Sequence, residues 1–240
     1  MQILLKLKGD NIVLPIAYRY FIQSMIYHIL ESQPSFSYFM HNKGFSGEER
    51  SFKLFSFSPL RGNYSVKDKK ITFSDTVSLE IRSTVPEIIE SLLKALSEGN
   101  TVNIGRNTLT VESCTLKNKT LYKSEAEITT VSPIVAYVTK DNTNRIFFSP
   151  NEDEFYSLII NNAKRKWISA GYDESEFDLS IEKTSRKPLR KEVTEFKKSR
   201  ITAWHGSFIL RGTPEVIDFL YQTGLGSKNS QGFGMFETIK

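Results

Sequence analysis

The order of predicted strands and helices indicates an α+β protein in which one βαββαβ pattern occurs twice. Alternating apolar residues predict strands, and apolar residues three or four positions apart predict helices. Both recur in the same order in each half, with extra hairpin strands in the first. A polar stretch at 117–124 separates the halves, so we expect domains at 1–119 and 120–240. This pattern is the ferredoxin-like topology that RRM domains also use. The sequence therefore predicts two tandem ferredoxin-like (RRM-like) domains.

The first half contains the clearest helix signals. Pro86 opens an amphipathic stretch that ends at Gly99, and proline favours the first turn of a helix as glycine favours its end. In chain order we expect a strand at 2–8, a helix at 18–30, a strand at 52–57, a hairpin of 70–73 with 77–81, a helix from 86 to 99 and a strand at 109–116.

The second half repeats this order around a basic segment. Pro214 starts its last helix in the position that Pro86 has in the first half. In chain order we expect a strand at 125–138, a helix at 152–167, strands at 177–181 and 201–210 with the basic segment between them, a helix at 216–221 and a final strand at 233–239.

Composition argues against several classes of protein. No apolar run approaches the roughly 20 residues that a membrane-spanning helix needs. The N-terminus alternates like a strand and lacks the layout of a signal peptide. Cys114 is the single cysteine, expected to be a buried small apolar residue, and no Cys/His cluster has metal-binding spacing. We expect a reduced, cytoplasmic protein with no metal, no other cofactor and no membrane association.

Positive charge is concentrated in one segment. The whole chain has a net charge of +5, and residues 183–200 hold eight Lys/Arg and two Glu, a net +6, so the remainder is close to neutral. Such a patch attracts phosphates. A solvated loop that binds nothing is the alternative. The residues predicted to contact the phosphate backbone of a nucleic acid are Arg186, Lys187, Arg190, Lys191, Lys197, Lys198 and Arg200.

A glycine-rich loop, GLGSKNSQGFG at 224–234, lies between the last predicted helix and strand. A dinucleotide-binding loop runs from strand to helix, so this order argues against a nucleotide cofactor. Two interpretations remain: a loop that follows a polyanion backbone, or a tight structural turn. In the first, Lys228 and Asn229 at the tip would hold phosphates.

The chain resembles the CRISPR-associated endoribonucleases that cut precursor CRISPR RNA within each repeat, the sixth Cas family. The loop matches that family's G-hydrophobic-G-x5-G-hydrophobic-G signature, and upstream blocks occur in the family's order over essentially the whole chain. These blocks are LPIAYRYFIQSMIYHIL, KLFSFS, VSPI, EFYSLI and TAWHGSF. The resemblance implies tandem ferredoxin-like domains, metal-independent cleavage and a guide RNA as product.

The same resemblance implies a catalytic site. A histidine just after the first helix has the acid/base role, a tyrosine on that helix assists, and a lysine that opens the next strand completes the site. These positions correspond to His41, Tyr27 and Lys53. Histidine suits proton transfer because its unperturbed pKa is about 6.5.

Alternatives remain open at each of these positions. The stretch GFSGEER lengthens the gap between His41 and Lys53, which makes Lys43 a rival to Lys53. Tyr27 is also consistent with simple packing. His28 is the second choice for the acid/base role. His205 is expected to be structural or an RNA contact.

Three functional hypotheses follow. The first is a metal-independent endoribonuclease that acts on CRISPR repeat RNA. The second is a non-catalytic subunit that binds repeat RNA within a CRISPR effector complex. The third is a tandem ferredoxin-like protein whose basic segment binds an acidic protein. The sequence leaves open association with other effector subunits and formation of a homodimer.

Overall fold

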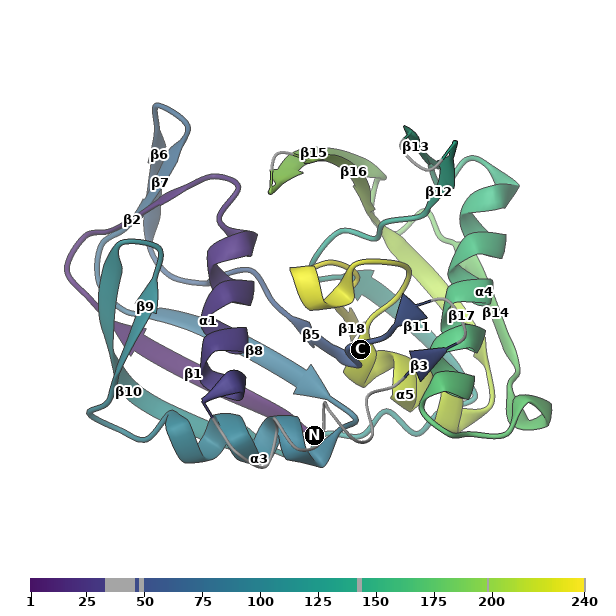
Figure 1. Cartoon of the computed structure of the whole chain (residues 1–240). Coiled ribbons are helices and arrows are strands. Elements are labelled where there is room, and N and C mark those ends of the chain that lie inside the picture. The colour runs from purple at the N-terminus through teal and green to yellow at the C-terminus, as the bar shows by residue number, and fades with distance from the viewer. Residues whose placement is uncertain (33–45, 48–49, 142–143, 198, 240) are drawn as a thin grey trace. The chain divides into compact units, whose positions relative to one another are not determined.

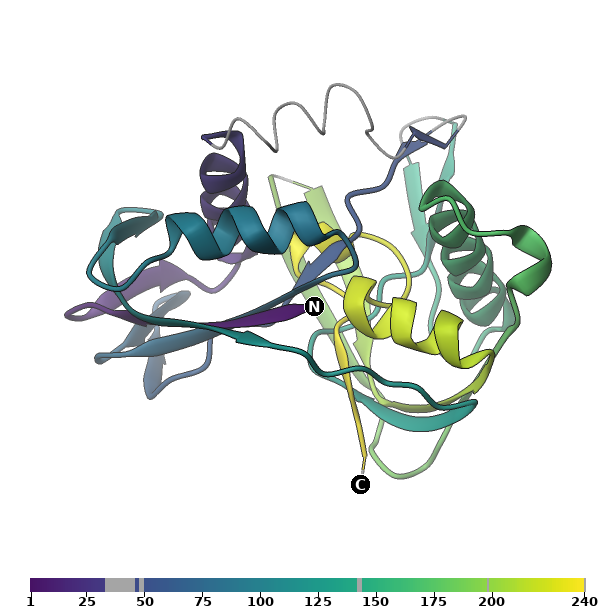
Figure 2. The ribbon, with the colours of Figure 1, turned by 90° about the horizontal axis from the view of Figure 1, so that it is seen from below.

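The computed structural model describes residues 1–32, 46–47, 50–141, 144–197 and 199–239 (Figure 1). The chain divides into two compact units. Unit 1 comprises Met1–Gly44 and Phe57–Lys119, and unit 2 comprises Phe45–Ser56 and Thr120–Lys240. In each unit the helices cover one face of an antiparallel sheet (Figure 2).

The main sheet of unit 1 has the strand order β5-β8-β1-β10-β9, and the division between the units at Ser56 and Phe57 falls within its edge strand β5. Along the chain, β1 (Gln2–Lys8), α1 (Arg19–Glu31), β5 (Phe55–Phe57), β8 (Val77–Ser83), α3 (Pro86–Ala95) and β10 (Asn107–Lys117) form the βαββαβ pattern. The four strands of that pattern therefore lie in the order second, third, first, fourth. Strand β9 (Thr101–Ile104) extends the sheet by pairing with β10.

The main sheet of unit 2 has the order β14-β17-β11-β18. Its pattern along the chain is β11 (Glu125–Thr130), α4 (Asp153–Ser169), β14 (Leu179–Lys183), β17 (Ser207–Gly212), α5 (Pro214–Thr223) and β18 (Phe236–Thr238). The strands again lie in the order second, third, first, fourth. The prediction of an α+β fold with two tandem ferredoxin-like domains is confirmed.

Apolar faces hold each unit together. In unit 1, Ile3, Leu5 and Leu7 of β1 are fully buried, as are Ile22 and Ile26 on the apolar face of α1. In unit 2, Phe155 of α4 stacks on Phe208 of β17 at 6.1 Å between ring centroids, and both rings are fully buried. Burial of each such side chain contributes about 1.5–3 kcal/mol.

Smaller sheets accompany the two main sheets. In unit 1, β2 (Ile12–Pro15), β7 (Lys70–Phe73) and β6 (Tyr64–Lys67) form a three-stranded sheet. In unit 2, β3 (Ser46–Gly47) pairs with β4 (Arg50–Ser51), β12 (Tyr137–Lys140) with β13 (Asn144–Phe147), and β15 (Arg190–Phe196) with β16 (Ser199–His205). Two short 3-10 helices, η1 (Glu174–Glu176) and η2 (Asn229–Gln231), complete the described elements.

Several predicted strands have different limits or partners. Segment 70–73 forms its hairpin with 64–67, whereas 77–83 pairs with β1. The strand expected at 125–138 is two strands, because Pro133 cannot donate a backbone hydrogen bond to a ladder. The strand expected at 201–210 is likewise two, which Gly206 separates.

Cys114 is half-buried rather than buried. Pairing of β1 with β10 shifts register between Lys6 and Leu7, which leaves an extra residue in β10 near Cys114 and disturbs the alternation of buried and exposed positions. Partial burial raises the pKa of the Cys114 thiol to about 11, so the reactive thiolate is scarce at neutral pH.

None of the helices in the described part of the chain is both long and apolar enough to cross a membrane.

Candidate nucleic-acid interface

The glycine-rich loop 224–234 joins α5 to β18 and is packed against its own unit. A Cβ atom on Gly234, whose φ is +76°, would lie 1.9 Å from the Leu225 carbonyl oxygen. One on Gly226, at φ +64°, would lie 2.6 Å from the Val135 carbonyl oxygen. These glycines are therefore required by close approaches within the chain itself.

Segment 131–136 runs beside this loop and fixes it through backbone hydrogen bonds. The amide of Gly234 donates to the carbonyl of Pro133, and the amide of Ser227 donates to the carbonyl of Val135, both at 2.9 Å. The VSPI block of the sequence therefore forms part of the loop's support.

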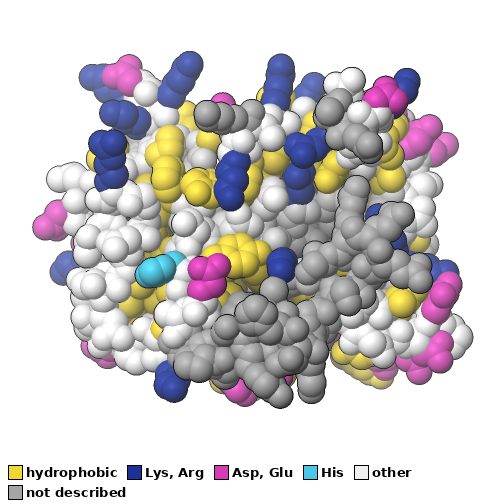
Figure 3. Space-filling model, viewed as in Figure 1, with side chains coloured by type: hydrophobic (Ala, Val, Ile, Leu, Met, Phe, Trp, Pro, Cys, Tyr) yellow, Lys and Arg dark blue, Asp and Glu magenta, His cyan; other side chains and the backbone are white. Residues whose placement is uncertain are grey.

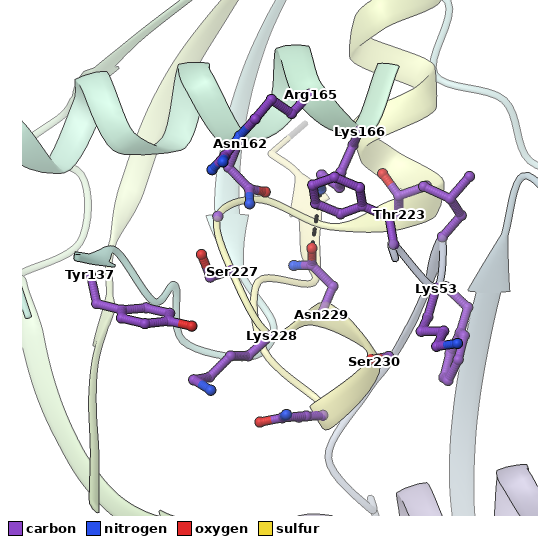
Figure 4. A pocket seen from close by; sticks show the side chains of 15 residues that line it. Lys53, Tyr137, Asn162, Arg165, Lys166, Thr223, Ser227, Lys228, Asn229 and Ser230 are labelled. Carbon is purple, nitrogen blue, oxygen red and sulfur yellow. Dashed lines mark hydrogen bonds between the residues drawn. The ribbon is translucent and has the colours of Figure 1, made fainter. Parts of the chain in front are cut away.

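A buried lysine closes the loop from the other side. Lys166 of α4 is 2% exposed, and its Nζ donates to the carbonyl of Gly224 and, at 3.1 Å, to Oδ1 of Asn229 (Figure 4). The Asn229 amide donates to the carbonyls of Leu225 and Phe233 at 3.0 and 3.1 Å. Asn229, predicted as a phosphate contact, thus uses its side chain within the loop.

The environment of Lys166 changes its titration. Burial lowers the pKa of the Lys166 ammonium to about 7, because removal from water disfavours the charged form. At neutral pH Lys166 is therefore not a fixed cation. Its two described hydrogen bonds identify it as a residue that positions the loop.

A cavity of about 200 Å³ lies beside the loop within unit 2. Its basic residues are Lys53, Arg165, Lys166 and Lys228, and the described residues that line it include no carboxylate. The full lining is Phe52, Lys53, Leu54, Phe55, Tyr137, Asn162, Arg165, Lys166, Thr223, Gly226, Ser227, Lys228, Asn229, Ser230 and Gln231. In Figure 4 Asn162 extends from α4 toward the loop, while Tyr137 and Lys228 lie on one side of it. The arrangement favours a ligand that carries negative charge.

Lys53 lies in this cavity but not in a strand. Strand β5 begins only at Phe55, because Leu54 has a φ of +38°, which an extended strand cannot accommodate. The expectation of a strand from 52 is wrong at this end. Partial burial lowers the pKa of the Lys53 ammonium. The cavity brings Lys53 together with Lys228 and Asn229.

Of the other residues predicted for catalysis, the structure describes Tyr27 and the alternative His28. Tyr27 lies on α1 of unit 1 and is half-buried. His41 and its neighbour Lys43 lie outside the described residues. His28, the alternative acid/base, is exposed on α1 and lines a groove of unit 1 with Tyr20, Phe21 and Asn103 among others.

The basic segment forms much of the β15–β16 hairpin and the connection that leads into it. Lys197 has a φ of +47° at its turn, and Lys198 lies outside the described residues. Figure 3 shows several Lys and Arg side chains over the region of β15 and β16. The six described predicted contacts are all exposed, namely Arg186, Lys187, Arg190, Lys191, Lys197 and Arg200.

Two features modify the surroundings of the cations in this basic segment. Arg186 pairs with Glu127 at 2.9 Å, so part of its charge is neutralised. Lys191 Nζ lies 5.9 Å from the ring centroid of Trp204, directly across the hairpin, and Arg200 lies opposite Glu195. One face of the hairpin therefore combines the cations Lys191 and Arg200 with the Trp204 ring and Glu195.

His205 is held by neighbouring side chains. Its Nε2 lies 3.1 Å from Glu192 Oε2 and its Nδ1 lies 3.1 Å from Thr130 Oγ1. These contacts fit the expected structural role. Among the described residues, no group of three His, Cys, Asp or Glu side chains is arranged to hold a metal ion.

Sequence reasoning missed the contribution of α4 and β12 to this site. Asn162 and Lys166 occupy the buried stripe of α4 with Phe155 and Ile159, so polar residues at core-facing positions were the available signal. Tyr137 opens β12 and carried no signal that distinguishes it from the other aromatic residues.

Comparisons with known proteins agree with this fold and loop. The family described as CRISPR-associated protein Cas6, N-terminal, matches residues 13–115, and CRISPR associated protein Cas6, C-terminal, matches residues 116–238. These are two halves of one class of CRISPR-associated protein. The chain belongs to the Cas6 family.

Individual relatives cover nearly the whole chain. A CRISPR-associated endoribonuclease Cas6 of Methanocaldococcus jannaschii is 29% identical over all of this chain and 93% of its own length. An endoribonuclease-like protein, Cas6nc, of Pyrococcus horikoshii is 30% identical over 99% of this chain and 98% of its own. A solved structure described as an RAMP protein binding different RNA substrates has a TM-score of 0.81 at 25% identity, with both chains fully covered.

Replacing Gly234 with alanine is expected to reduce the free energy of unfolding by about 2–4 kcal/mol, since the new Cβ would collide with a backbone carbonyl. Gly171→Ala is the matched control, because φ is +90° there but nothing lies within 4 Å, and it should cost about 1–2 kcal/mol. Urea unfolding followed by tryptophan fluorescence measures both. Equal losses would show that close packing of the loop is not the cause.

Lys166→Met is expected to remove a pH dependence of stability. Between pH 7 and about 10.5 the unfolded chain binds more protons at this amine than the folded chain, so the wild-type free energy of unfolding rises with pH. The slope approaches about 1.4 kcal/mol per pH unit. Urea unfolding of both proteins at pH 6, 7, 8 and 9 measures the difference. If the difference in free energy of unfolding between the two proteins does not change with pH, the lowered pKa of Lys166 is contradicted.

Proposed function

We propose that this protein is a metal-independent endoribonuclease that cleaves CRISPR repeat RNA to give mature guide RNA. The match of both halves of the chain to the Cas6 family carries this proposal. The names of curated relatives as endoribonucleases support the activity. The cation-lined cavity and the basic hairpin support binding of a phosphate-bearing substrate.

The proposed chemistry uses a nucleophile that the RNA itself carries. The 2′-oxygen attacks the adjacent phosphorus in line, so that an O2′–P bond forms while the P–O5′ bond breaks. The proton of the 2′-hydroxyl passes to a general base, and the departing O5′ receives a proton from a general acid. The products are a 2′,3′-cyclic phosphate and a 5′-hydroxyl. The protein must align the attack, move these protons and stabilise the charged phosphorane.

Three residues are proposed for these tasks. His41 transfers protons, and Tyr27 donates a hydrogen bond that orients the phosphate. Lys53 neutralises the charge that develops on the phosphate. The position of Lys53 in a cavity without described carboxylates supports this role, because no acidic neighbour there offsets its charge.

Binding of the RNA backbone is assigned to a separate set of side chains. Lys228 lines the cavity from the loop, and the exposed cations of the hairpin extend the positive surface. Asn229 is proposed to act indirectly, by holding the loop in place. Contacts of this kind fix the register of the backbone and do not read bases.

The second candidate is a non-catalytic subunit that binds repeat RNA in a CRISPR effector complex. The 30% identity to a relative that is named endoribonuclease-like supports this second candidate. In that case the protein would associate with other effector subunits, and its RNA affinity would not require His41. Homodimerisation is compatible with either candidate.

Cleavage of a labelled repeat RNA in excess EDTA tests the first candidate. We expect one cut by the wild type and a rate about 100- to 10,000-fold lower for His41→Ala, because the acid/base group is lost. His205→Ala is the control, since this histidine pairs with Glu192 and is expected to leave the cleavage rate unchanged.

Two results would contradict the first candidate. Cutting of a substrate with a 2′-deoxy sugar 5′ of the cleavage site would exclude attack by the RNA's own hydroxyl. Tight binding without any cut by the wild type would favour the non-catalytic subunit instead.

Neutralising the hairpin is expected to weaken RNA binding and its salt dependence together. For the triple variant Arg190→Gln, Lys191→Gln and Arg200→Gln, the slope of log K against log salt should fall by about 2, at roughly 0.7 per lost phosphate contact on single strands. Fluorescence anisotropy between 50 and 300 mM salt measures the slope. Lys67→Gln, Lys69→Gln and Lys70→Gln remove three exposed charges of unit 1 as the control. Equal slopes in the two triple variants would remove the hairpin from the binding surface.

A further inference from the structure

The cavity beside the glycine loop contains hydrogen-bonding capacity that the protein does not use. Oδ1 of Asn162 and Oε1 of Gln231 are buried and have no hydrogen-bond partner among the described residues. Asn162 is only 8% exposed and points from α4 toward the loop (Figure 4). Leaving a buried acceptor unpaired costs about 1–3 kcal/mol, so each of these oxygens favours a ligand that brings a donor.

The chemistry of these acceptors limits the class of ligand that suits the cavity. A phosphate group offers acceptor oxygens and would leave both amide oxygens unpaired. A nucleobase with an exocyclic amino group offers two N–H donors on one nitrogen, as adenine and cytosine do, whereas uracil carries one N–H on its pairing edge. The unpaired amide oxygen of Asn162 in this cavity therefore favours a base that carries an amino group.

An aromatic ring lies at the same cavity. Tyr137 lines it and is half-buried, and Lys228 Nζ lies 5.1 Å from the centroid of its ring. A base stacked on an aromatic side chain gains about 1–3 kcal/mol, and this gain is nearly independent of its identity. Stacking on Tyr137 would hold a base, while the amide oxygen of Asn162 would select it.

Size supports a single base. The cavity of about 200 Å³ is smaller than the roughly 300–1,000 Å³ of sites for drug-sized ligands. The surrounding cations Lys53, Arg165 and Lys228 suit the phosphates on either side of such a base. A base in a duplex is paired and stacked between its neighbours, so it must be unpaired before a cavity of this size can receive it.

We propose that this cavity receives one unpaired nucleobase with an exocyclic amino group and that Asn162 reads that group. The inference rests on the proposed function in one respect, namely that the chain binds single-stranded RNA. It adds a point of base recognition to a surface that otherwise contacts the backbone. Asn162 is thereby assigned as a residue that determines specificity.

Binding of three labelled octanucleotides, oligo(A), oligo(C) and oligo(U), tests the inference by fluorescence anisotropy at one salt concentration. We expect the wild type to bind oligo(A) or oligo(C) about tenfold more tightly than oligo(U), the discrimination typical of one unpaired polar group. Asn162→Leu should reduce this ratio to about twofold or less. Asn161→Leu makes the same change at the neighbouring exposed position of α4 and should keep the wild-type ratio.

A second variant separates stacking of the base on Tyr137 from recognition of its amino group by Asn162. Tyr137→Leu should weaken binding of all three oligonucleotides by about tenfold and leave their ratio unchanged, because stacking does not depend on the amino group. Urea unfolding of each variant shows whether it is folded. Asn162→Leu breaks no hydrogen bond of Oδ1 within the described residues, so we expect it to retain stability.

The outcomes distinguish this inference from the proposed function. Equal wild-type binding of the three oligonucleotides, with normal cleavage of repeat RNA, would overturn base reading and keep the nuclease. A preference that survives in Asn162→Leu would overturn the role of Asn162. Failure to bind any of the oligonucleotides or the repeat RNA would overturn both proposals.

Discussion

The buried contact between Lys166 and the glycine loop is the interaction on which the geometry of the site depends. Lys166 Nζ donates to Gly224 and Asn229, and Asn229 holds the carbonyls of Leu225 and Phe233. One helix side chain therefore ties both arms of the loop together. Burying an amine is costly unless its donors are satisfied, and here two oxygens accept from it. Since the loop is closed internally, the side chains at its tip have a defined direction toward the cavity.

The loop accordingly divides its tasks between residue types. Gly226 and Gly234 permit close approach to neighbouring backbone, and a side chain at either position would collide with a carbonyl oxygen. The residues between them, including Ser227, Lys228 and Gln231, line the cavity. The exposed cations of the β15–β16 hairpin lie outside the set of residues that line the cavity, and in the proposed function they contact the RNA backbone. In the two proposals, affinity and specificity therefore belong to different surfaces of unit 2.

Sequence patterns predicted elements well where one period held over the whole segment. The strand at Gln2–Lys8 has the predicted limits, and the helices that Pro86 and Pro214 open begin at those prolines. Errors fell where a single residue interrupts a pattern. Leu54 at positive φ delays the strand that was expected from 52, and Gly206 divides an apparent strand between two sheets. The alternation of apolar and polar residues continues across such breaks, so the sequence pattern does not reveal the change in backbone conformation.

The sequence by itself determined the fold class, the basic segment and the glycine signature, because periodicity, charge and motif spacing are all local properties of the chain. Only the tertiary structure identified Lys166, Asn162 and Tyr137 as parts of one cavity with Lys53 and Lys228. These residues come from α4, β12, the segment before β5 and the glycine loop, which are far apart along the chain. Their meeting depends on how helix and sheet pack in unit 2, and packing is a property of the whole unit that no local pattern encodes.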